Sequence, residues 1–149
     1  MHQQLSKSVS LERVVTVTAG AAGTSDINST AVDMAGFEGV MFLVQMGAIV
    51  SGAVTSVKVQ QSDDDGSSDD YTDVEGTAQT VADNDDEEVF YVDVFRPRKR
   101  YVRLVVDRGT QNATCSAVAV KYGPTRKMPT THGTGVNGET HVSPAEGTA

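Results

Sequence analysis

Tryptophan is absent from this 149-residue chain, and aromatic residues make up only 5% of it. A domain with so few aromatic side chains must build a thin, largely aliphatic core, and valine is plentiful. The one cysteine, Cys115, excludes an intrachain disulfide. Its place in the alternating segment 113–122 predicts a packed, structural thiol. A core of this kind favours additional stabilisation by oligomerisation.

Long hydrophobic runs are also missing. The most apolar stretch, residues 40–50, is about a third to a half of what a membrane-spanning helix needs, and Gln45 and Gly47 interrupt it. Residues 1–10 lack the charged and apolar regions of a signal peptide. We therefore expect neither a membrane partner nor a secretion signal.

Catalytic motifs are absent as well. The only histidines are His2, His132 and His141, all in polar terminal regions where a general base or a metal ligand would not be held rigidly. The sequence has no nucleophile elbow, no phosphate-binding glycine loop and no cysteine pair with zinc spacing. We expect no enzymatic activity and no cofactor.

Charge is sorted into blocks along the chain. The formal net charge is −8 and the pI is about 4.7, which argues against nucleic-acid binding. Residues 62–93 hold 13 of the 20 acidic residues and no lysine or arginine. The next residues, 96–100, read Arg-Pro-Arg-Lys-Arg and form a basic cluster between two apolar segments.

The acidic loop 62–70 is the best metal candidate. Its Asp63, Asp65 and Asp69 surround Gly66, and clustered aspartate oxygens with a glycine turn suit calcium. The spacing does not match the helix-loop-helix calcium pattern, because Val74 stands where that pattern requires glutamate. A solvated loop between strands is the favoured interpretation, so no metal site is assigned.

Periodicity predicts an all-β fold. Short segments rich in β-branched residues alternate between apolar and polar, with Gly, Asp, Asn and Pro turns between them, and no helical stripe is evident. This pattern is typical of an antiparallel β-sandwich, of which a jelly roll is one form. In residues 101–107 we expect Val102, Leu104 and Val106 on the buried face. In residues 9–19 we expect Val9, Leu11, Val15 and Val17 on one side of the strand. Residues 39–46 are apolar on both faces, which predicts a central strand covered on both sides. The predicted strands cover residues 9–19, 27–34, 39–46, 54–61, 89–95, 101–107 and 113–122.

The two ends differ from the middle. Residues 123–149 contain three of the four prolines and little alternation, which predicts an extended or flexible C-terminal tail. Residues 1–8 are similarly polar and form a shorter arm. The expected organisation is an arm at 1–8, a sandwich domain at 9–122 and a tail at 123–149.

The basic cluster is the main candidate for partner binding. Its charges could blunt the end of a sheet, contact nucleic acid, or pair with an acidic patch on a partner. The last is favoured, because copies of the chain could set the cluster against the acidic loops of a neighbour. The candidate partner-binding residues are Arg96, Arg98, Lys99 and Arg100, together with Arg126, Lys127 and Met128 in the tail.

Four segments of the chain carry a resemblance to known proteins. They read FEGVMFLVQMG, VTSVKVQQSDDDGSSDDYTDVEGT, VDVFRPRKRYVRLVVDRGT and AVAVKYGPTRKMP. They resemble a family of small structural proteins from tailed-bacteriophage head gene clusters. The resemblance covers roughly residues 9–129 and is most specific in RPRKRYVRLVVDRG. It implies a β-rich, often trimeric head decoration or cement protein, seated on the outer capsid and bound to the major capsid protein.

Other functions remain compatible with the sequence. A carbohydrate- or calcium-binding module would use the acidic loop, although few aromatic platforms are present. A head-completion or tail-tube component would use an acidic sheet as a lining towards DNA.

Overall fold

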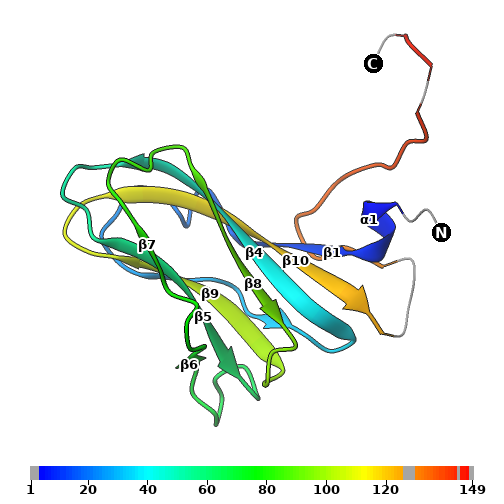
Figure 1. The fold of residues 1–149 in the computed structure, drawn as a ribbon, viewed down its shortest axis with the longest axis horizontal. Helices are drawn as coiled ribbons and strands as arrows, with labels where there is room; N and C mark the ends of the chain where they lie inside the picture. Colours follow the sequence, from blue (N-terminus) through cyan, green and yellow to red (C-terminus); the bar gives the residue numbers. More distant parts are fainter. Residues whose placement is uncertain (1–3, 126–129, 144, 148–149) are drawn as a thin grey trace.

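The computed structural model describes residues 4–125, 130–143 and 145–147 of the chain (Figure 1). Apart from one four-residue helix, the regular structure in these residues is entirely β, as the sequence predicts. The elements are α1 (Leu5–Ser8), β1 (Ser10–Val15), β2 (Ile27–Asn28), β3 (Val32–Asp33), β4 (Phe37–Ile49), β5 (Thr55–Ser62), β6 (Thr72–Asp73), β7 (Gln79–Val81), β8 (Val89–Phe95), β9 (Tyr101–Arg108) and β10 (Ala113–Pro124).

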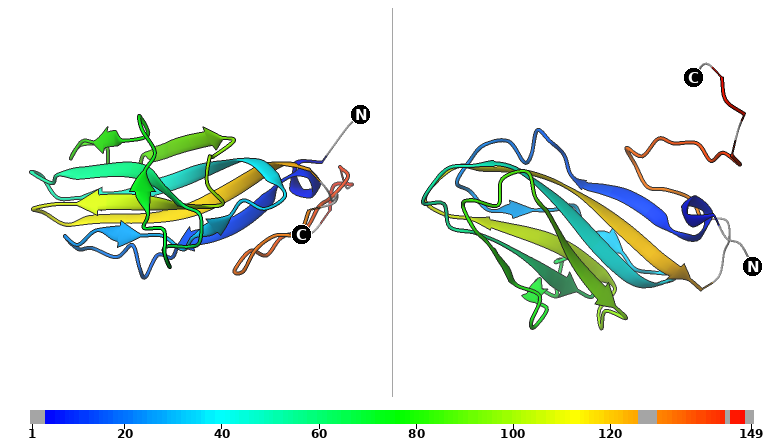
Figure 2. Two further views of the ribbon diagram at one scale, coloured as in Figure 1. Left: turned by 90° about the horizontal axis from the view of Figure 1, so that it is seen from below. Right: turned by 45° about the horizontal axis from the view of Figure 1, so that its top comes forward.

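The strands form two antiparallel sheets. Sheet A has the order β1-β10-β4-β8, and sheet B has the order β2-β9-β5-β6, with β3 also on β9 and β7 also on β5. Strand β1 therefore pairs with β10, and β2 and β3 pair with β9. Strand β4 pairs with β8, and β5 pairs with β6 and β7. This nested pairing is the topology of a jelly roll. The two layers are visible in Figure 2.

The core lies between the sheets and is aliphatic. Val102, Leu104 and Val106 of β9 are fully buried, as predicted, and they face a row on β4 that includes Phe42. Cys115 is also buried, as predicted, and burial raises the pKa of its thiol. Phe42 is the largest fully buried side chain, in keeping with a chain that lacks tryptophan.

The prediction for β1 is wrong in part. A β-bulge between Arg13 and Val15 shifts the register, so the alternation of apolar residues does not follow one face. Before the bulge, Glu12 pairs with the buried Ala119. Val17 lies beyond the end of the strand and is 78% exposed.

Strand β4 lies between β10 and β8, as expected of a central strand. Its Val40, Phe42, Val44 and Met46 point into the core. Its other face is only half-buried at Met41 and Leu43 and exposed at Gln45. The prediction that residues 39–46 are covered on both faces therefore fails within the described part of this chain.

The segment at 27–34 is not one continuous strand. It splits into β2 and β3, which pair with opposite halves of β9. Ser29 lies between them, and its hydroxyl accepts a hydrogen bond of 2.9 Å from the N–H of Leu104. A polar side chain thus replaces one ladder bond where the strand is interrupted.

The C-terminal segment contacts the sandwich. Strand β10 continues to Pro124, two residues past the limit expected for the domain. Farther along, the N–H of Thr130 donates to Lys7 and the N–H of Gly133 donates to Leu11. These bonds place residues 130–133 along the outer edge of β1, near α1 (Figure 1).

Candidate functional site

The basic cluster forms the turn between β8 and β9. The backbone of Arg96 has a left-handed conformation (φ 52°), and its N–H donates to the carbonyl of Glu38 at 2.7 Å. The guanidinium of Arg96 also lies 3.3 Å from the carboxylate of Glu38, and both side chains are well exposed. The turn is therefore anchored to the beginning of β4.

Two basic residues of the turn are paired within the chain. Arg100 donates two hydrogen bonds, of 2.9 and 2.7 Å, to the carboxylate of Asp33. The ammonium of Lys99 lies 2.5 Å from a carboxylate oxygen of Asp69. The hydrogen bond from Arg100 lowers the pKa of Asp33, and that from Lys99 lowers the pKa of Asp69. Within one copy, Lys99 thus joins the basic turn to the acidic loop, and Arg100 joins it to β3.

Arg98 differs from these residues. Its side chain is exposed, and no ion pair joins it to any residue that the structure describes. It lies at the tip of the turn, between Pro97 and Lys99. Arg98 is therefore the basic side chain of the cluster most available to a partner.

The acidic loop is organised by its own hydrogen bonds. The carboxylate of Asp64 accepts the backbone N–H groups of Ser67, Ser68 and Asp69 at 2.7 to 3.0 Å. These bonds lower the pKa of Asp64, and the bond from the N–H of Asp69 has the largest effect. Sequence reasoning did not single out Asp64, because an aspartate that caps a turn looks like any other in a run of aspartates.

The three weak metal candidates are held apart by different partners. Asp65 accepts a hydrogen bond of 2.6 Å from the hydroxyl of Tyr71. Asp69 contacts Lys99 and also accepts the N–H of Asp63 at 2.8 Å. Across the described residues, no three His, Cys, Asp or Glu side chains gather in a geometry that could hold a metal ion.

Two grooves flank the basic turn. One has a volume of about 480 Å³ and lies between Arg96, Pro97 and Arg98 on one side and Asp73 and Glu75 on the other. The second, also about 480 Å³, lies between the turn and the β3–β4 loop. Its walls there are the apolar residues Met34, Ala35 and Phe37. Arg98 lines both grooves.

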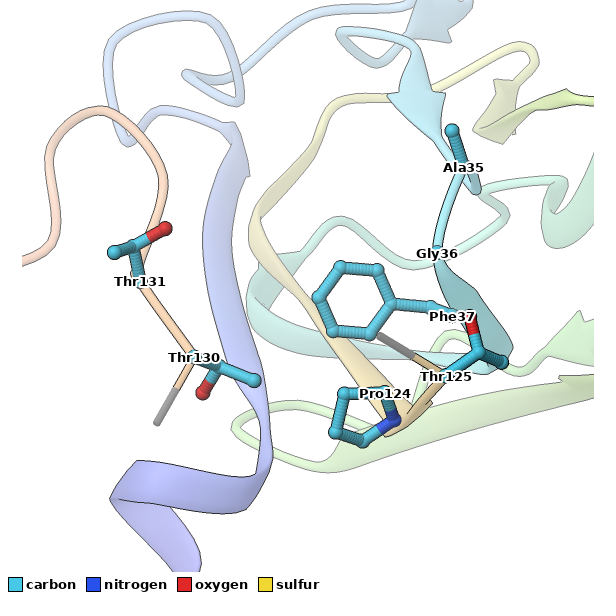
Figure 3. Close-up of a pocket in the computed structure, with 7 residues that line it drawn as sticks. All are labelled: Ala35, Gly36, Phe37, Pro124, Thr125, Thr130 and Thr131. Carbon is cyan, nitrogen blue, oxygen red and sulfur yellow. The ribbon is translucent and has the colours of Figure 1, made fainter. Parts of the chain in front are cut away.

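A third groove, of about 560 Å³, lies next to the second. It is formed by the β3–β4 loop, the end of β10 and the C-terminal segment. Figure 3 shows the ring of Phe37 beside Pro124 and Thr125, with Thr130 and Thr131 on a separate segment. The ammonium of Lys121 lies 4.8 Å from the centre of the Phe37 ring. This end of the sandwich therefore combines basic, hydroxyl and apolar groups.

The remaining predicted residues contribute less to this site. Arg126, Lys127 and Met128 lie outside the described residues. His132 accepts a hydrogen bond of 3.1 Å from the N–H of Leu11, and His141 lies 3.2 Å from Glu139.

No helix in the described part of the chain is long and apolar enough to cross a membrane.

Comparisons with known proteins give structural likenesses only. No protein-family model matches the chain, and no curated protein matches it. The PBSX exported protein XepA has a similar fold, with a TM-score of 0.53 and 16% sequence identity over 99% of this chain. That match spans 46% of XepA, so this chain is less than half as long as the similar protein. The SPBc2 prophage-derived protein YomS matches 75% of this chain and 92% of its own, with a TM-score of 0.45 and 13% identity.

Proposed function

We propose that this chain is a non-enzymatic structural protein of a bacteriophage particle. In this role it binds the outer surface of the capsid as a decoration or cement protein, with the major capsid protein as its partner. The observation that carries the proposal is the jelly-roll fold, which the chain shares over 99% of its length with the phage-derived XepA. The resemblance of its sequence to phage head proteins supports the same role.

The end of the sandwich around the basic turn is the proposed contact with the shell. Three adjacent grooves and the exposed Arg98 offer charged and apolar groups to a partner. A single copy that makes only these contacts would bind weakly. Self-association, with the trimer implied by the resemblance, would raise the avidity for a repetitive shell.

A cement protein stabilises a shell because it binds the assembled form in preference to the free subunits. The acidic composition of this chain fits an exterior position, since net negative charge keeps a particle soluble and disfavours adsorption of DNA. Lys99 holds the acidic loop against the turn, and Arg100 holds β3 against it. They would shape the contact surface more than bind the shell themselves.

Sedimentation with shells that lack this protein tests the proposal. We expect saturable co-pelleting, at a copy number that matches the symmetry of the shell, and greater heat resistance of the loaded shells. Arg98→Glu should reduce binding by at least tenfold. Lys7→Glu makes the same change in net charge on α1 and should bind as the unaltered protein does. Absence of co-pelleting at any concentration would contradict the proposal.

A further inference from the structure

The outer faces of the two sheets have opposite character. On sheet B, the ammonium of Lys58 lies 3.2 Å from Asp73 and 3.6 Å from Asp107. The guanidinium of Arg103 donates to Gln60 and lies 4.0 Å from the centre of the Tyr71 ring. This face is covered by polar groups that satisfy one another, as expected of a surface in contact with water.

The outer face of sheet A is apolar. Strand pairing aligns its residues in rows across all four strands, and the central positions belong to β10 and β4. One row reads Leu11, Val120, Met41, Asp93, and the next reads Arg13, Val118, Leu43, Tyr91. On β8, Val89, Tyr91 and Phe95 are 56%, 61% and 58% exposed.

The size of this apolar surface is sufficient for a contact. Four strands at about 4.8 Å spacing, over six residues of about 3.4 Å each, give a flat area of about 400 Å². This area is in the range of the largest apolar patch on a typical monomer, and such a patch is often functional. It is about half of the ~800 Å² that each partner contributes to a standard interface, which fits a weak and reversible contact.

Charge on this face is confined to two opposite edges. Among the described strand residues that share the face, only Arg13 on β1 and Asp93 on β8 are charged. In a chain with a net charge of −8, a face with one positive and one negative side chain avoids the repulsion expected between copies. The positions of Arg13 and Asp93 also make the face complementary to itself.

We infer that the outer face of sheet A packs against the same face of a second copy of this chain. A two-fold axis parallel to the strands places β1 of one copy over β8 of the other. Arg13 of each copy then lies over Tyr91 of the other and one row from Asp93. In the single copy the guanidinium of Arg13 lies against Gly135 of the C-terminal segment, so it must turn away from Gly135 to reach the Asp93 of the other copy. The half-exposed side chains of Met41 and Leu43 become buried at the centre of the contact.

This arrangement explains why residues 39–46 are apolar on both faces. It also has a consequence for stoichiometry, because a two-fold contact gives an even number of copies: a dimer, or a hexamer when two of the proposed trimers pair through this face. The inference does not depend on the proposed binding to a shell. The two can fail separately, since self-association is measured on the isolated protein.

Analytical ultracentrifugation of the full chain from about 1 to 100 µM tests the inference. We expect reversible association to an even multiple of 15.7 kDa. Tyr91→Lys, at an exposed position, should raise the dissociation constant at least tenfold with an unchanged circular dichroism spectrum. Val54→Lys, at an exposed loop position (67%) away from sheet A, should leave the constant unchanged.

Charge reversal tests the register of the contact. Arg13→Asp and Asp93→Arg should each weaken association, and the two changes in one chain should restore it. Because Asp93 also accepts a hydrogen bond from Tyr122, the matched control is Tyr122→Phe, which removes that bond and keeps the charge. We expect this control to associate normally.

Three results would overturn the inference. The first is a monomer at every concentration, and the second is an odd-numbered assembly. The third is association that Tyr91→Lys does not weaken. Tyr91→Lys could also lose binding to shells while its self-association in the ultracentrifuge stays unchanged. In that case the outer face of sheet A would bind a capsid protein and not a second copy.

Discussion

The hydroxyl of Tyr122 on β10 donates a hydrogen bond of 2.7 Å to the carboxylate of Asp93 on β8, across the intervening strand β4. The ring can lie there because position 39 is a glycine. A β-carbon on Gly39 would come within 2.2 Å of the Tyr122 ring. A missing side chain on the central strand thus lets two non-adjacent strands be joined over the outer surface of the sheet.

Removal of the Tyr122 hydroxyl should lower the stability only slightly at neutral pH, but it should change how the stability depends on pH above pH 10. Burial, reinforced by the bond to Asp93, raises the pKa of Tyr122 to about 12. The unfolded chain releases the same proton near pH 10, so the contribution to stability is complete below pH 10 and is lost as the pH rises towards 12. Tyr122→Phe should reduce the free energy of unfolding by about 0.5 to 1 kcal/mol at pH 7. It should also flatten the decline in stability between pH 10 and 12.

Urea unfolding of the two proteins, repeated across this pH range, provides the measurement. The control is Tyr91→Phe, which removes an exposed hydroxyl from the same face and leaves the bond between Tyr122 and Asp93 in place. Equal decline in Tyr122→Phe and in the unaltered protein would show that the Tyr122 hydroxyl does not set the alkaline limit.

The ion pair between Arg100 and Asp33 should be detectable at acid pH. The hydrogen bond from Arg100 holds the pKa of Asp33 below its ordinary value of 3.8. The stabilisation that follows is present above pH 3.8 and is lost as the pH falls through the lower, folded value. Carboxyl carbon NMR should show the pKa of Asp33 rising towards 3.8 in Arg100→Gln. Arg98→Gln removes a neighbouring charge that has no ion pair with a described residue, and it should leave Asp33 nearly unchanged.

Arg108 should be among the most sensitive polar positions. Its buried guanidinium donates to the backbone carbonyls of Ser25, Ala21 and Ala113 at 2.7 to 2.9 Å. The loop between β1 and β2 is therefore held by one side chain. Arg108→Leu should lower the free energy of unfolding by about 2 to 4 kcal/mol, because three carbonyls lose a charged donor. Calorimetry measures this loss, with Arg96→Leu as the control. The side chain of Arg96 is 71% exposed, so its replacement should lower the free energy of unfolding by under about 1 kcal/mol.

The sequence predicted the fold class well, for a physical reason. Residues 101–107 alternate except at Val105, and the sheet has period two, so Leu104 could be placed in the core without knowledge of its neighbours. The same reasoning failed at Val17, because the bulge after Arg13 changes the face and leaves no trace in a pattern of hydrophobicity. Strands β6 and β7 were missed, since two or three residues are too few to show a period.

Prediction of the candidate site was limited by long-range contacts. The basic cluster was recognised as a turn, but its pairing with Asp33 and Asp69 depends on residues 67 and 30 positions away. The blocks of opposite charge suggested a contact between copies. Within one copy, Lys99 pairs with Asp69, because the jelly-roll topology brings the β5–β6 loop and the β8–β9 turn to one end of the sandwich. The contact between copies stays a prediction.

Core packing gives a direct check of the alternation argument. Leu104 is fully buried, so Leu104→Ala should cost about 2 to 5 kcal/mol through lost burial and a residual cavity. Val17→Ala removes apolar atoms at a position that is 78% exposed, and it should change stability by under about 0.5 kcal/mol. Chemical unfolding of both variants compares the two positions. A larger loss for Val17→Ala than for Leu104→Ala would mean that the register of β1 has been assigned wrongly.

The pair formed by Lys121 and Glu12 should show how a buried charge depends on its partner. The two charged groups lie 2.5 Å apart, with only 9% and 23% of their side chains exposed. Glu12→Gln leaves the ammonium of Lys121 buried without its carboxylate, and it should cost about 3 kcal/mol. Lys121→Met with Glu12→Gln removes the unpaired charge while it keeps the packing against Phe37, so the double variant should be more stable than Glu12→Gln alone. Urea unfolding of Glu12→Gln, of Lys121→Met alone and of the double variant gives the coupling energy. Strictly additive losses would show that the two groups do not interact in the folded protein.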